Sequence, residues 1–425
     1  MKKINYLKII LLFIVITILI KTLFFYRGIY FAPKKTVHNL SVSLIKPESK
    51  KFIDAFEKTE GYVLIDKSHG NNFEDDEIEA LLSRINSRNN KIEFLENEDG
   101  LENKLRYVNS FVVILPTEDF NQNELSLTKD FLQKNRKLLL IADPDRQSNI
   151  NSIANNFNII FSEDYLYNLK ENNGNFRFIS LKDFNKNEIT KKLNKIAFYT
   201  SCPIFPLDRG VAFTDKNTYA SSSESQNGFT PVVFLSPILA VCDLTFLNQP
   251  FNSVADNNIF ISNIADFLTK NDRKFSVADF PYFFKKNVAI VTTNLDLSSN
   301  AVNLKNILSN ADINANIKRK LNTSVDSIVI ELFDEFKATP LENLIVDKDS
   351  IRINDLLFNK KDSSLVYLSK ENATILTILS DNKKVMEKTI TMIETEDIRK
   401  NLIDDNLAVF RFEVKEEENK ENEIK

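Results

Sequence analysis

Three polar residues that could do chemistry follow a short apolar run. Asp66, Ser68 and His69 come directly after the residues Gly-Tyr-Val-Leu-Ile at 61–65, and His69 is one of only two histidines in 425 residues. A histidine beside a carboxylate at the end of a strand can act as a general base or contact a bound ligand. This stretch is therefore the first place at which the sequence suggests a site.

The same stretch also has a purely structural interpretation, in which it is a turn between a strand and a helix. Gly70 supplies a permissive backbone, and Asn71 or Asn72 caps the helix that follows. A serine and a histidine one residue apart do not form a triad signature, because triad members are usually distant in sequence. We favour the turn over a catalytic role.

Acidic residues end two later apolar runs. Asp143 and Asp145 flank Pro144 at the end of the run 137–145, and Asp243 follows the apolar start of the run 238–248. Two carboxylates in this position could hold a divalent cation, or they could cap the helix that begins near residue 148. We favour capping.

These strand ends converge if the strands are parallel, because open α/β sheets bind ligands at the carboxyl ends of their strands. We assign no catalytic residue to this crevice and expect neither a metal nor another cofactor there. The candidate ligand crevice consists of Asp66, Ser68, His69, Asp143 and Asp243.

The elements that must position these residues alternate between short β-rich runs and amphipathic stretches. Such alternation predicts an α/β fold with a doubly wound, mostly parallel sheet. The expected strands lie at 61–65, 91–95, 110–116, 137–145, 158–161, 195–205, 209–213, 231–237 and 238–248, and the expected helices at 73–89, 101–107, 121–135, 148–157 and 256–272. Residues 162–192 are polar and predict an irregular excursion.

A second, smaller α/β domain is expected beyond residue 286. Its predicted strands lie at 287–294, 324–333, 364–368, 374–379 and 407–414, with a helix at 301–311. The link at 273–286 contains Phe280, Tyr282, Phe283 and Phe284. We favour the interpretation that these side chains pack between the two domains. The alternative is that they form an exposed patch for a partner. We therefore expect domains at 55–272 and 287–414 and a charged tail at 415–425.

The N-terminal region predicts a membrane anchor. Residues 9–26 form an apolar run whose single charged residue is Lys21. The length of this run is near the lower limit for a helix that crosses a bilayer. A cleaved signal peptide is the alternative, but no A-x-A-like cleavage site follows the run. We expect an uncleaved transmembrane anchor within residues 1–28, a link at 29–54, and the remainder on the extracytoplasmic side.

Composition excludes several classes of function. The chain has only 7 glycines and neither a GxGxxG nor a GxxxxGK[ST] motif, so a nucleotide site of those types is not expected. A net charge of −4 without a basic stripe argues against nucleic acid as a partner. Cys202 and Cys242 are too few for a structural zinc site; we favour two buried free thiols over a disulfide, which an extracytoplasmic domain would permit.

Three stretches, 63–73, 112–145 and 240–269, together resemble a family of membrane-anchored proteins. The soluble part of that family has a class I glutamine amidotransferase-like, flavodoxin-like domain. The wider group includes the GldG-type component of gliding-motility ABC transporters and intraflagellar-transport homologues. The resemblance covers about residues 55–272. The amidotransferase nucleophile is a cysteine in a glycine-flanked elbow after a buried strand; the matching position here carries Asp143, so the resemblance implies a degenerate site.

The expected role is a non-enzymatic, membrane-anchored binding or scaffolding subunit of a membrane complex. The resemblance implies a membrane-complex protein as partner, with an ABC- or AAA-type ATPase system as the associated machinery. Two alternatives use the strand-end residues instead. One is a hydrolase or metal-dependent enzyme, and the other is a receptor for a small, sugar-like ligand.

Overall fold

The computed structural model divides the chain into two compact units, Met1–Lys51 and Phe52–Lys425. Residues 29–51 of the expected link and the expected tail at 415–425 lie outside the residues that the structure describes. The described residues are 6–26, 52–172, 174–222, 228–272, 274–284, 287–336, 344–395 and 397–412.

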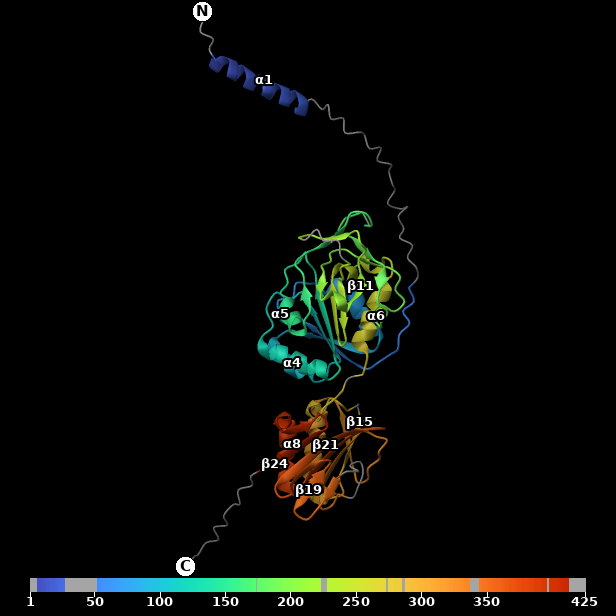
Figure 1. Cartoon of the computed structure of the whole chain (residues 1–425). Helices are drawn as coiled ribbons and strands as arrows, with labels where there is room; N and C mark the ends of the chain where they lie inside the picture. Colours follow the sequence, from blue (N-terminus) through green and yellow to red (C-terminus); the bar gives the residue numbers. More distant parts are fainter. Residues whose placement is uncertain are drawn as a thin grey trace, which may run out of the picture. The chain divides into compact units, whose positions relative to one another are not determined.

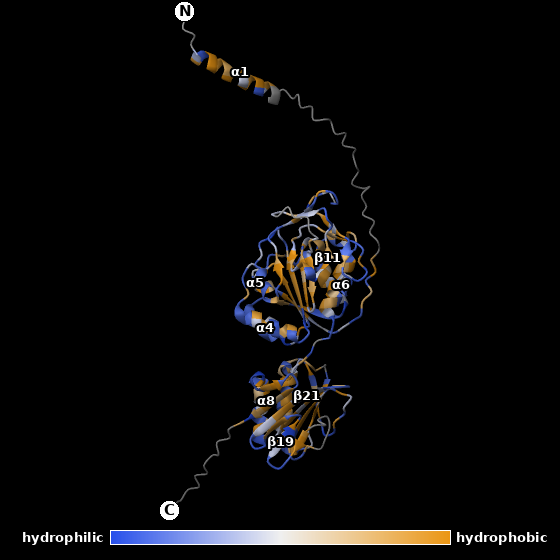
Figure 2. Ribbon diagram, in the orientation of Figure 1, coloured by the Kyte–Doolittle hydropathy of each residue, from blue (hydrophilic) through white to orange (hydrophobic). Residues whose placement is uncertain are grey.

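The first unit contains one helix, α1 (Tyr6–Tyr26), among its described residues. Its window Tyr6–Leu23 has a mean hydropathy of 2.4, and none of that window is buried. Figure 2 shows the hydrophobic colour along its length. The helix is long and apolar enough to cross a membrane, as a signal sequence also would be. The predicted apolar segment at 9–26 is thus helical and begins three residues earlier.

Phe52–Lys425 contains two large sheets (Figure 1). The first sheet has the strand order β2-β1-β3-β4-β14-β13-β11-β8. The strands β2, β1, β3, β4 and β14 are parallel, and the last three strands are antiparallel to their neighbours. In sheet order these strands are Asn90–Leu95, Gly61–Asp66, Ser110–Ile114, Lys137–Ala142, Ile238–Cys242, Val232–Leu235, Gly210–Phe213 and Asp183–Phe184.

The central strands are apolar on both faces because helices cover both. In β1, Val63 and Ile65 belong to one buried cluster and Leu64 to another, and β3 and β4 alternate in the same way. Burying one such side chain fully stabilises the fold by about 1.5–3 kcal/mol. The first cluster includes α2 (Glu79–Ser87) and α6 (Asn257–Thr269), and the second includes α3 (Leu101–Leu105), α4 (Gln122–Gln133) and α5 (Asn151–Ala154).

The region after α5 is more ordered than the sequence suggests. The expected irregular excursion at 162–192 contains β6, β7 and β8, and the single strand expected at 195–205 is two strands, β9 and β10. The residues between β9 and β10 form a loop beside the end of β14. The short strands are β5 (Ile160–Phe161), β6 (Leu166–Asn168), β7 (Ile179–Leu181), β9 (Ile196–Phe198), β10 (Ile204–Phe205) and β12 (Thr218–Ala220).

An extended strap at residues 52–60 packs against α2 and α6. Arg84 and Arg88 lie over the rings of Phe52 and Phe56, with 4.6 and 4.7 Å from the guanidinium carbon to the ring centroids. Both arginines form ion pairs with Asp54, at 3.2 and 3.1 Å. The strap is therefore an ordered part of the second unit.

Most of residues 276–284 in the link between the two sheets are buried. Phe280, Phe283 and Phe284 are 3%, 5% and 7% exposed and belong to the core of the second sheet. Arg106, which follows α3, donates to the backbone oxygen of Phe280 at 2.7 Å. The alternative of an exposed aromatic patch is wrong for these phenylalanines, because the sheet that follows covers them.

The second sheet has the order β16-β15-β17-β22-β21-β24-β23, with the first four strands parallel. Helices α7 (Ser298–Asn310) and α8 (Lys383–Glu394) share one core with it, and a three-stranded sheet, β18-β19-β20, contributes to another. In chain order, β15 to β24 are Asn287–Val291, Asn314–Lys318, Ser327–Leu332, Leu344–Val346, Ser350–Ile353, Leu356–Asn359, Ser363–Lys370, Thr374–Ser380, Leu402–Asp404 and Leu407–Arg411.

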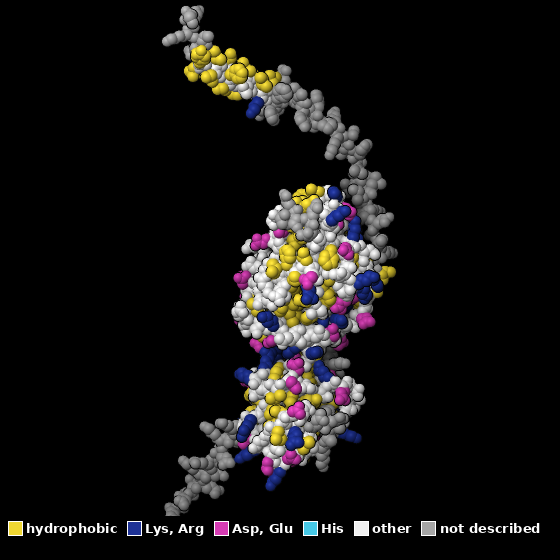
Figure 3. Space-filling model, in the orientation of Figure 1, with side chains coloured by type: hydrophobic (Ala, Val, Ile, Leu, Met, Phe, Trp, Pro, Cys, Tyr) yellow, Lys and Arg dark blue, Asp and Glu magenta, His cyan; other side chains and the backbone are white. Residues whose placement is uncertain are grey.

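Charge is mixed on the face drawn in Figure 3, where Lys and Arg are interspersed with Asp and Glu outside α1. The chain as a whole has 55 basic and 59 acidic residues, which nearly cancel.

Candidate functional site

Asp66, Ser68 and His69 form a contiguous cluster at the carboxyl end of β1. The side chains of Asp66 and His69 are fully buried, and the His69 Nδ1 lies 3.0 Å from an Asp66 oxygen. The Ser68 hydroxyl donates to Asp66 at 2.8 Å. The backbone turns at Gly70, whose φ is +60° and where an added Cβ would lie 2.5 Å from the Thr117 hydroxyl oxygen. The expected turn is thus present and holds the polar cluster, but the prediction that Asn71 or Asn72 caps the following helix is wrong, because Glu74 is its N-cap.

Glu124 is a member of this cluster that the sequence did not reveal. Its carboxylate lies 3.3 Å from the His69 Nε2, and Glu124 is only 3% exposed. Glu124 is the third residue of α4 and forms a capping box with Asn121, whose backbone N–H it accepts at 2.7 Å. The ring of Phe120 stacks on that of His69 with centroids 3.7 Å apart.

The two carboxylates decide the charge of His69. Burial lowers the pKa of its imidazole, whereas the hydrogen bond and charge of Asp66, and then those of Glu124, raise it. The net effect is a raised pKa. Each ring nitrogen lies close to a carboxylate, Nδ1 at 3.0 Å from Asp66 and Nε2 at 3.3 Å from Glu124, and both carboxylates act in the raising direction.

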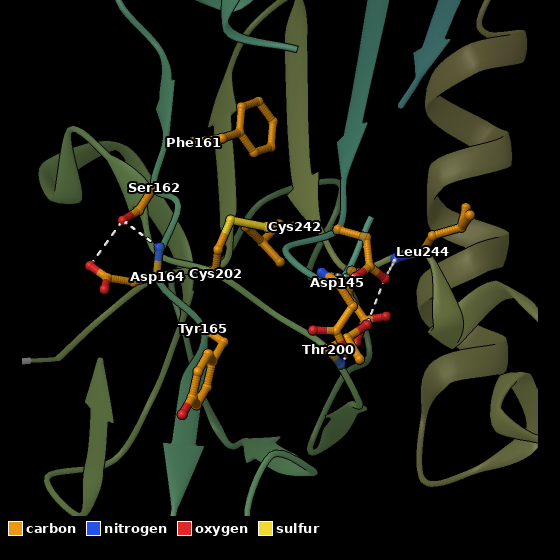
Figure 4. The surroundings of a disulfide bond; sticks show 12 residues. Asp145, Phe161, Ser162, Asp164, Tyr165, Thr200, Cys202, Cys242 and Leu244 are labelled. Carbon is orange, nitrogen blue, oxygen red and sulfur yellow. Dashed lines mark hydrogen bonds between the residues drawn. A yellow bond between two sulfur atoms is a disulfide. The ribbon is translucent and has the colours of Figure 1, made fainter. Parts of the chain in front are cut away.

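Asp143 and Asp243 form a second cluster, at the ends of β4 and β14. Thr200 connects them: its hydroxyl donates to Asp143 at 2.6 Å, and its backbone N–H donates to Asp243 at 3.2 Å. Asp143 also accepts the backbone N–H of Leu244 at 3.3 Å, and Asp243 accepts that of Phe246 at 3.1 Å. Figure 4 shows Thr200 and Leu244 at this junction.

Burial dominates the electrostatics of this pair. Desolvation raises the pKa of Asp143, although hydrogen bonds from Thr200 and the backbone oppose the rise. Desolvation and the neighbouring charge of Asp143 together raise the pKa of Asp243 to about 7. The pair therefore holds a proton at a pH at which an exposed aspartate would be ionised.

Cys202 and Cys242 form a disulfide, with 5.4 Å between their Cα atoms (Figure 4). The favoured prediction of two free thiols is wrong. Cys242 is the last residue of β14, and Cys202 lies in the loop between β9 and β10 that packs beside it. A separation of 40 residues in sequence carries no sign of this proximity.

The five residues of the candidate ligand crevice form two clusters at the carboxyl ends of the parallel strands. The strand order places β3 between β1 and β4, so one strand separates the clusters. Arg146 connects the loops above them, since it donates to the backbone oxygen of Asn72 at 3.1 Å and pairs with Glu77. Asp145, the other acid beside Pro144, pairs with Arg177. The favoured prediction that Asp143 and Asp145 cap the next helix is wrong, because the residue before α5 is Ile150 and no side chain caps that helix.

The strained backbone at this edge lies at Leu115, not at Asp143. Leu115 follows β3 with a φ of +46°, and Asp143 is not among the described residues of positive φ. A strained turn after a central strand is where a nucleophile elbow holds its reactive side chain. Leu115 is fully buried and cannot act as a nucleophile.

Among the described residues, His69, Glu98 and Glu124 bring ligand atoms together in a way that could suit a metal ion. These atoms all lie within 4.8 Å of one another. Neither Glu98 nor Glu124 was expected at a site. The capping pattern of Asn121 and Glu124 is the only sequence signal for either, and it predicts a helix start rather than a ligand.

No family model and no curated protein sequence matches the chain. Among solved structures it is similar to the mmIFT52 N-terminal domain, with 17% identity and a TM-score of 0.40, over 49% of this chain and 98% of that one. It is also similar to a ThuA-like protein from Bacteroides uniformis, with 9% identity and a TM-score of 0.34 over 52% and 96%. A ThuA-like protein from Parabacteroides merdae matches at 12% and 0.30 over 52% and 94%. The fold described above rests on strand order and packing rather than on these likenesses.

Proposed function

We propose that this chain is a single-pass membrane protein whose larger unit is a non-enzymatic binding or scaffolding subunit of a membrane complex. The apolar helix α1 supports the anchor. The parallel order β2-β1-β3-β4-β14 is the 2-1-3-4-5 order of flavodoxin-like sheets, which supports the amidotransferase-like assignment. An ABC- or AAA-type ATPase system is the associated machinery that the resemblance implies.

The observation that carries the non-enzymatic role is that the strand-end acids hold neighbouring loops in place. Asp243 accepts three backbone N–H groups, from Tyr199, Thr200 and Phe246. Asp143 accepts backbone N–H groups from Asp145 and Leu244. Carboxylates bonded in this way hold the loops at the strand ends in one arrangement.

The strained residue at the same edge supports this role. Leu115 accepts a hydrogen bond from the backbone of Asn72 at 2.9 Å and donates one to Ile141 at 3.0 Å. Its side chain is aliphatic, so the turn that could expose a nucleophile supports packing instead.

The disulfide supports an extracytoplasmic location of the larger unit. Disulfides persist in oxidising compartments and are rare in the cytosol. A short N-terminal tail inside and the folded unit outside is also the orientation expected from the sequence. The prediction is that protease added to intact cells removes a C-terminal epitope tag; protection of that tag in intact cells, with cleavage after lysis, would reverse the orientation.

Co-purification tests the scaffolding role. The tagged full chain, extracted in a mild detergent, is expected to retain a membrane protein partner in fixed stoichiometry. The matched control replaces residues 1–28 with an unrelated single membrane span. Retention of the partner by the control would assign binding to the larger unit, as proposed. A monomer without a partner from the native chain would contradict the proposal.

A further inference from the structure

We propose that His69, Glu98 and Glu124 bind a divalent cation, Zn²⁺ by their chemistry, through the histidine Nε2 and one oxygen of each carboxylate. The three ligand atoms lie within 4.8 Å of one another. Imidazole nitrogen and carboxylate oxygen are both ordinary zinc ligands. The inference is independent of the membrane-scaffold role.

The spacing of the two buried ligands suits a shared cation. The His69 Nε2 lies 3.3 Å from the Glu124 carboxylate. Two ligand atoms at about 2.0–2.1 Å from a tetrahedral Zn²⁺ are about 3.4 Å apart. A charge-assisted N–H···O hydrogen bond would be shorter, at about 2.7–2.9 Å. The Nε2 makes a long hydrogen bond to Oε2 and an ion pair with Oε1, both at 3.3 Å, and this separation also suits two ligands around one ion.

Asp66 orients the histidine for this role. Its carboxylate lies 3.0 and 3.1 Å from the Nδ1. In a neutral ring this contact places the proton on Nδ1 and leaves the Nε2 lone pair directed at Glu124. A carboxylate that holds the far nitrogen of a ligating histidine is the usual support of a metal site.

One oxygen of the buried Glu124 carboxylate lacks a hydrogen bond. Its Oε2 accepts the Asn121 backbone N–H at 2.7 Å. Its Oε1 is in ion-pair contact with the His69 Nε2 at 3.3 Å but forms no hydrogen bond with any described residue, although Glu124 is only 3% exposed. A buried carboxylate oxygen without a hydrogen bond is costly and requires an explanation. A cation between Oε1 and the His69 Nε2 provides one.

Glu98 completes the set from the solvent side. It begins the short helix η3 (Glu98–Gly100), which follows β2, and it is exposed. An exposed side chain can change rotamer to reach an ion without disturbing the core. The ion would then connect three segments that are distant in sequence: the turn after β1, η3 and the start of α4. Water can occupy the fourth position of a zinc ion that has three protein ligands.

The test measures binding of Zn²⁺ alone to the full chain. The protein is purified in mild detergent, treated with a chelator, dialysed and titrated by isothermal calorimetry. We expect one saturable Zn²⁺ per chain, and Co²⁺ in its place should give the visible absorption of a tetrahedral site. Glu98→Gln should weaken Zn²⁺ binding at least 10-fold, since it removes one of three protein ligands. Glu96→Gln, an exposed neighbour outside the set, should leave it unchanged.

His69→Gln should abolish binding and Asp66→Asn should weaken it, provided that circular dichroism shows them folded. Glu98→Gln keeps the proposal testable if those buried variants unfold, because its side chain is at the surface. The absence of saturable Zn²⁺ binding by the native chain would overturn the proposal and leave His69 as a buried ion-pair partner. Saturable binding that Glu98→Gln does not weaken would also overturn it.

Discussion

The two large sheets share the same order of four parallel strands but have different residues at the carboxyl ends of these strands. The order β2-β1-β3-β4 in the first corresponds to β16-β15-β17-β22 in the second, and all these neighbours are parallel. In the first sheet, β1, β4 and β14 end in buried ionisable groups. In the second, the corresponding edge has Thr293 bonded to Glu331 at 3.1 Å and the fully buried Ser380. The same topology therefore occurs with a cluster of buried ionisable groups at the strand ends and, in the second sheet, with the single carboxyl group of Glu331 beside Thr293 and Ser380.

The coverage of the two sheets differs as well. Helices cover both faces of the first sheet, whereas α7 and α8 share one core of the second and an antiparallel sheet shares another. A parallel sheet thus does not by itself create a site. The side chains at the strand ends create the site, and the function depends on them.

His69→Ala should give the largest difference in stability between variants at the strand ends of the first sheet and variants at those of the second. Removing His69 leaves the buried carboxylates of Asp66 and Glu124 without a cation, which should reduce the free energy of unfolding by about 3–5 kcal/mol. Thr293→Ala, at the second edge, should reduce it by under ~1 kcal/mol. Urea unfolding followed by circular dichroism in chelator-treated protein measures both. Equal losses would remove the contrast.

The disulfide should stabilise only the first sheet. Replacing Cys202 and Cys242 with serine opens a loop with a sequence separation of 40, and chain entropy predicts a loss of about 3–4 kcal/mol. Hydrogen exchange measured by mass spectrometry should then show faster exchange in β4 and β14, with β15 and β17 unchanged. Faster exchange in both sheets would show that they unfold as one unit.

The pH dependence of stability should also separate the edges. The pKa of Asp243 is raised to about 7 by burial and by Asp143, whereas an unfolded aspartate titrates near ~3.9. Between these values the folded chain holds more protons than the unfolded chain, so the free energy of unfolding falls as the pH rises towards 7 and levels off above it. Asp143 and Tyr199 are the titratable groups that face Asp243.

Asp243→Asn is the variant that isolates this effect. It should remove about 1 kcal/mol or more of the decrease between about pH 5 and pH 8, because an amide does not titrate. Denaturant unfolding at several pH values provides the measurement, and the difference in slope between variant and native chain cancels the contributions of other groups. Identical slopes would show that Asp243 is ionised throughout.

The smallest expected effect is that of Glu331→Gln in the second sheet. Burial raises the pKa of Glu331 and the hydrogen bond from Thr293 lowers it, with a raised net value. The amide keeps an acceptor for Thr293, so the change in the free energy of unfolding should be below ~1 kcal/mol. A loss as large as that of His69→Ala, measured in the same urea titration, would mean that the second edge also depends on a buried charge.

The apolar runs were sufficient to predict the centre of the first sheet. Strands β1, β3, β4 and β14 and helices α4 and α6 lie where hydrophobic patterning placed them, since a buried parallel strand is apolar throughout. Helix α8 was missed, and so were the short strands within 162–192 and the edge strand β16. Their apolar residues are sparse, and long-range pairing decides their structure.

Only the part of the candidate site formed by residues that are neighbours in sequence could be predicted. Asp66, Ser68 and His69 are neighbours in sequence, so their cluster could be anticipated from one strand end. Glu124 is 55 residues beyond His69, and only the packing of α4 against the turn brings them together. The error over Cys202 has the same cause, because its loop divides a run that had been predicted as one strand.

The strap at residues 52–60 determines how force would enter the larger unit. Phe52, Asp54 and Phe56 alternate with exposed residues such as Ile53, so the first half of the strap attaches through every second side chain. Tension applied from the N-terminal side would act on the contacts of Arg84 and Arg88 before it reached β1. The two arginines would therefore bear the load first, and the contacts of Thr59 with Arg88 and Thr269 would bear it next, before it reached the strand-end clusters.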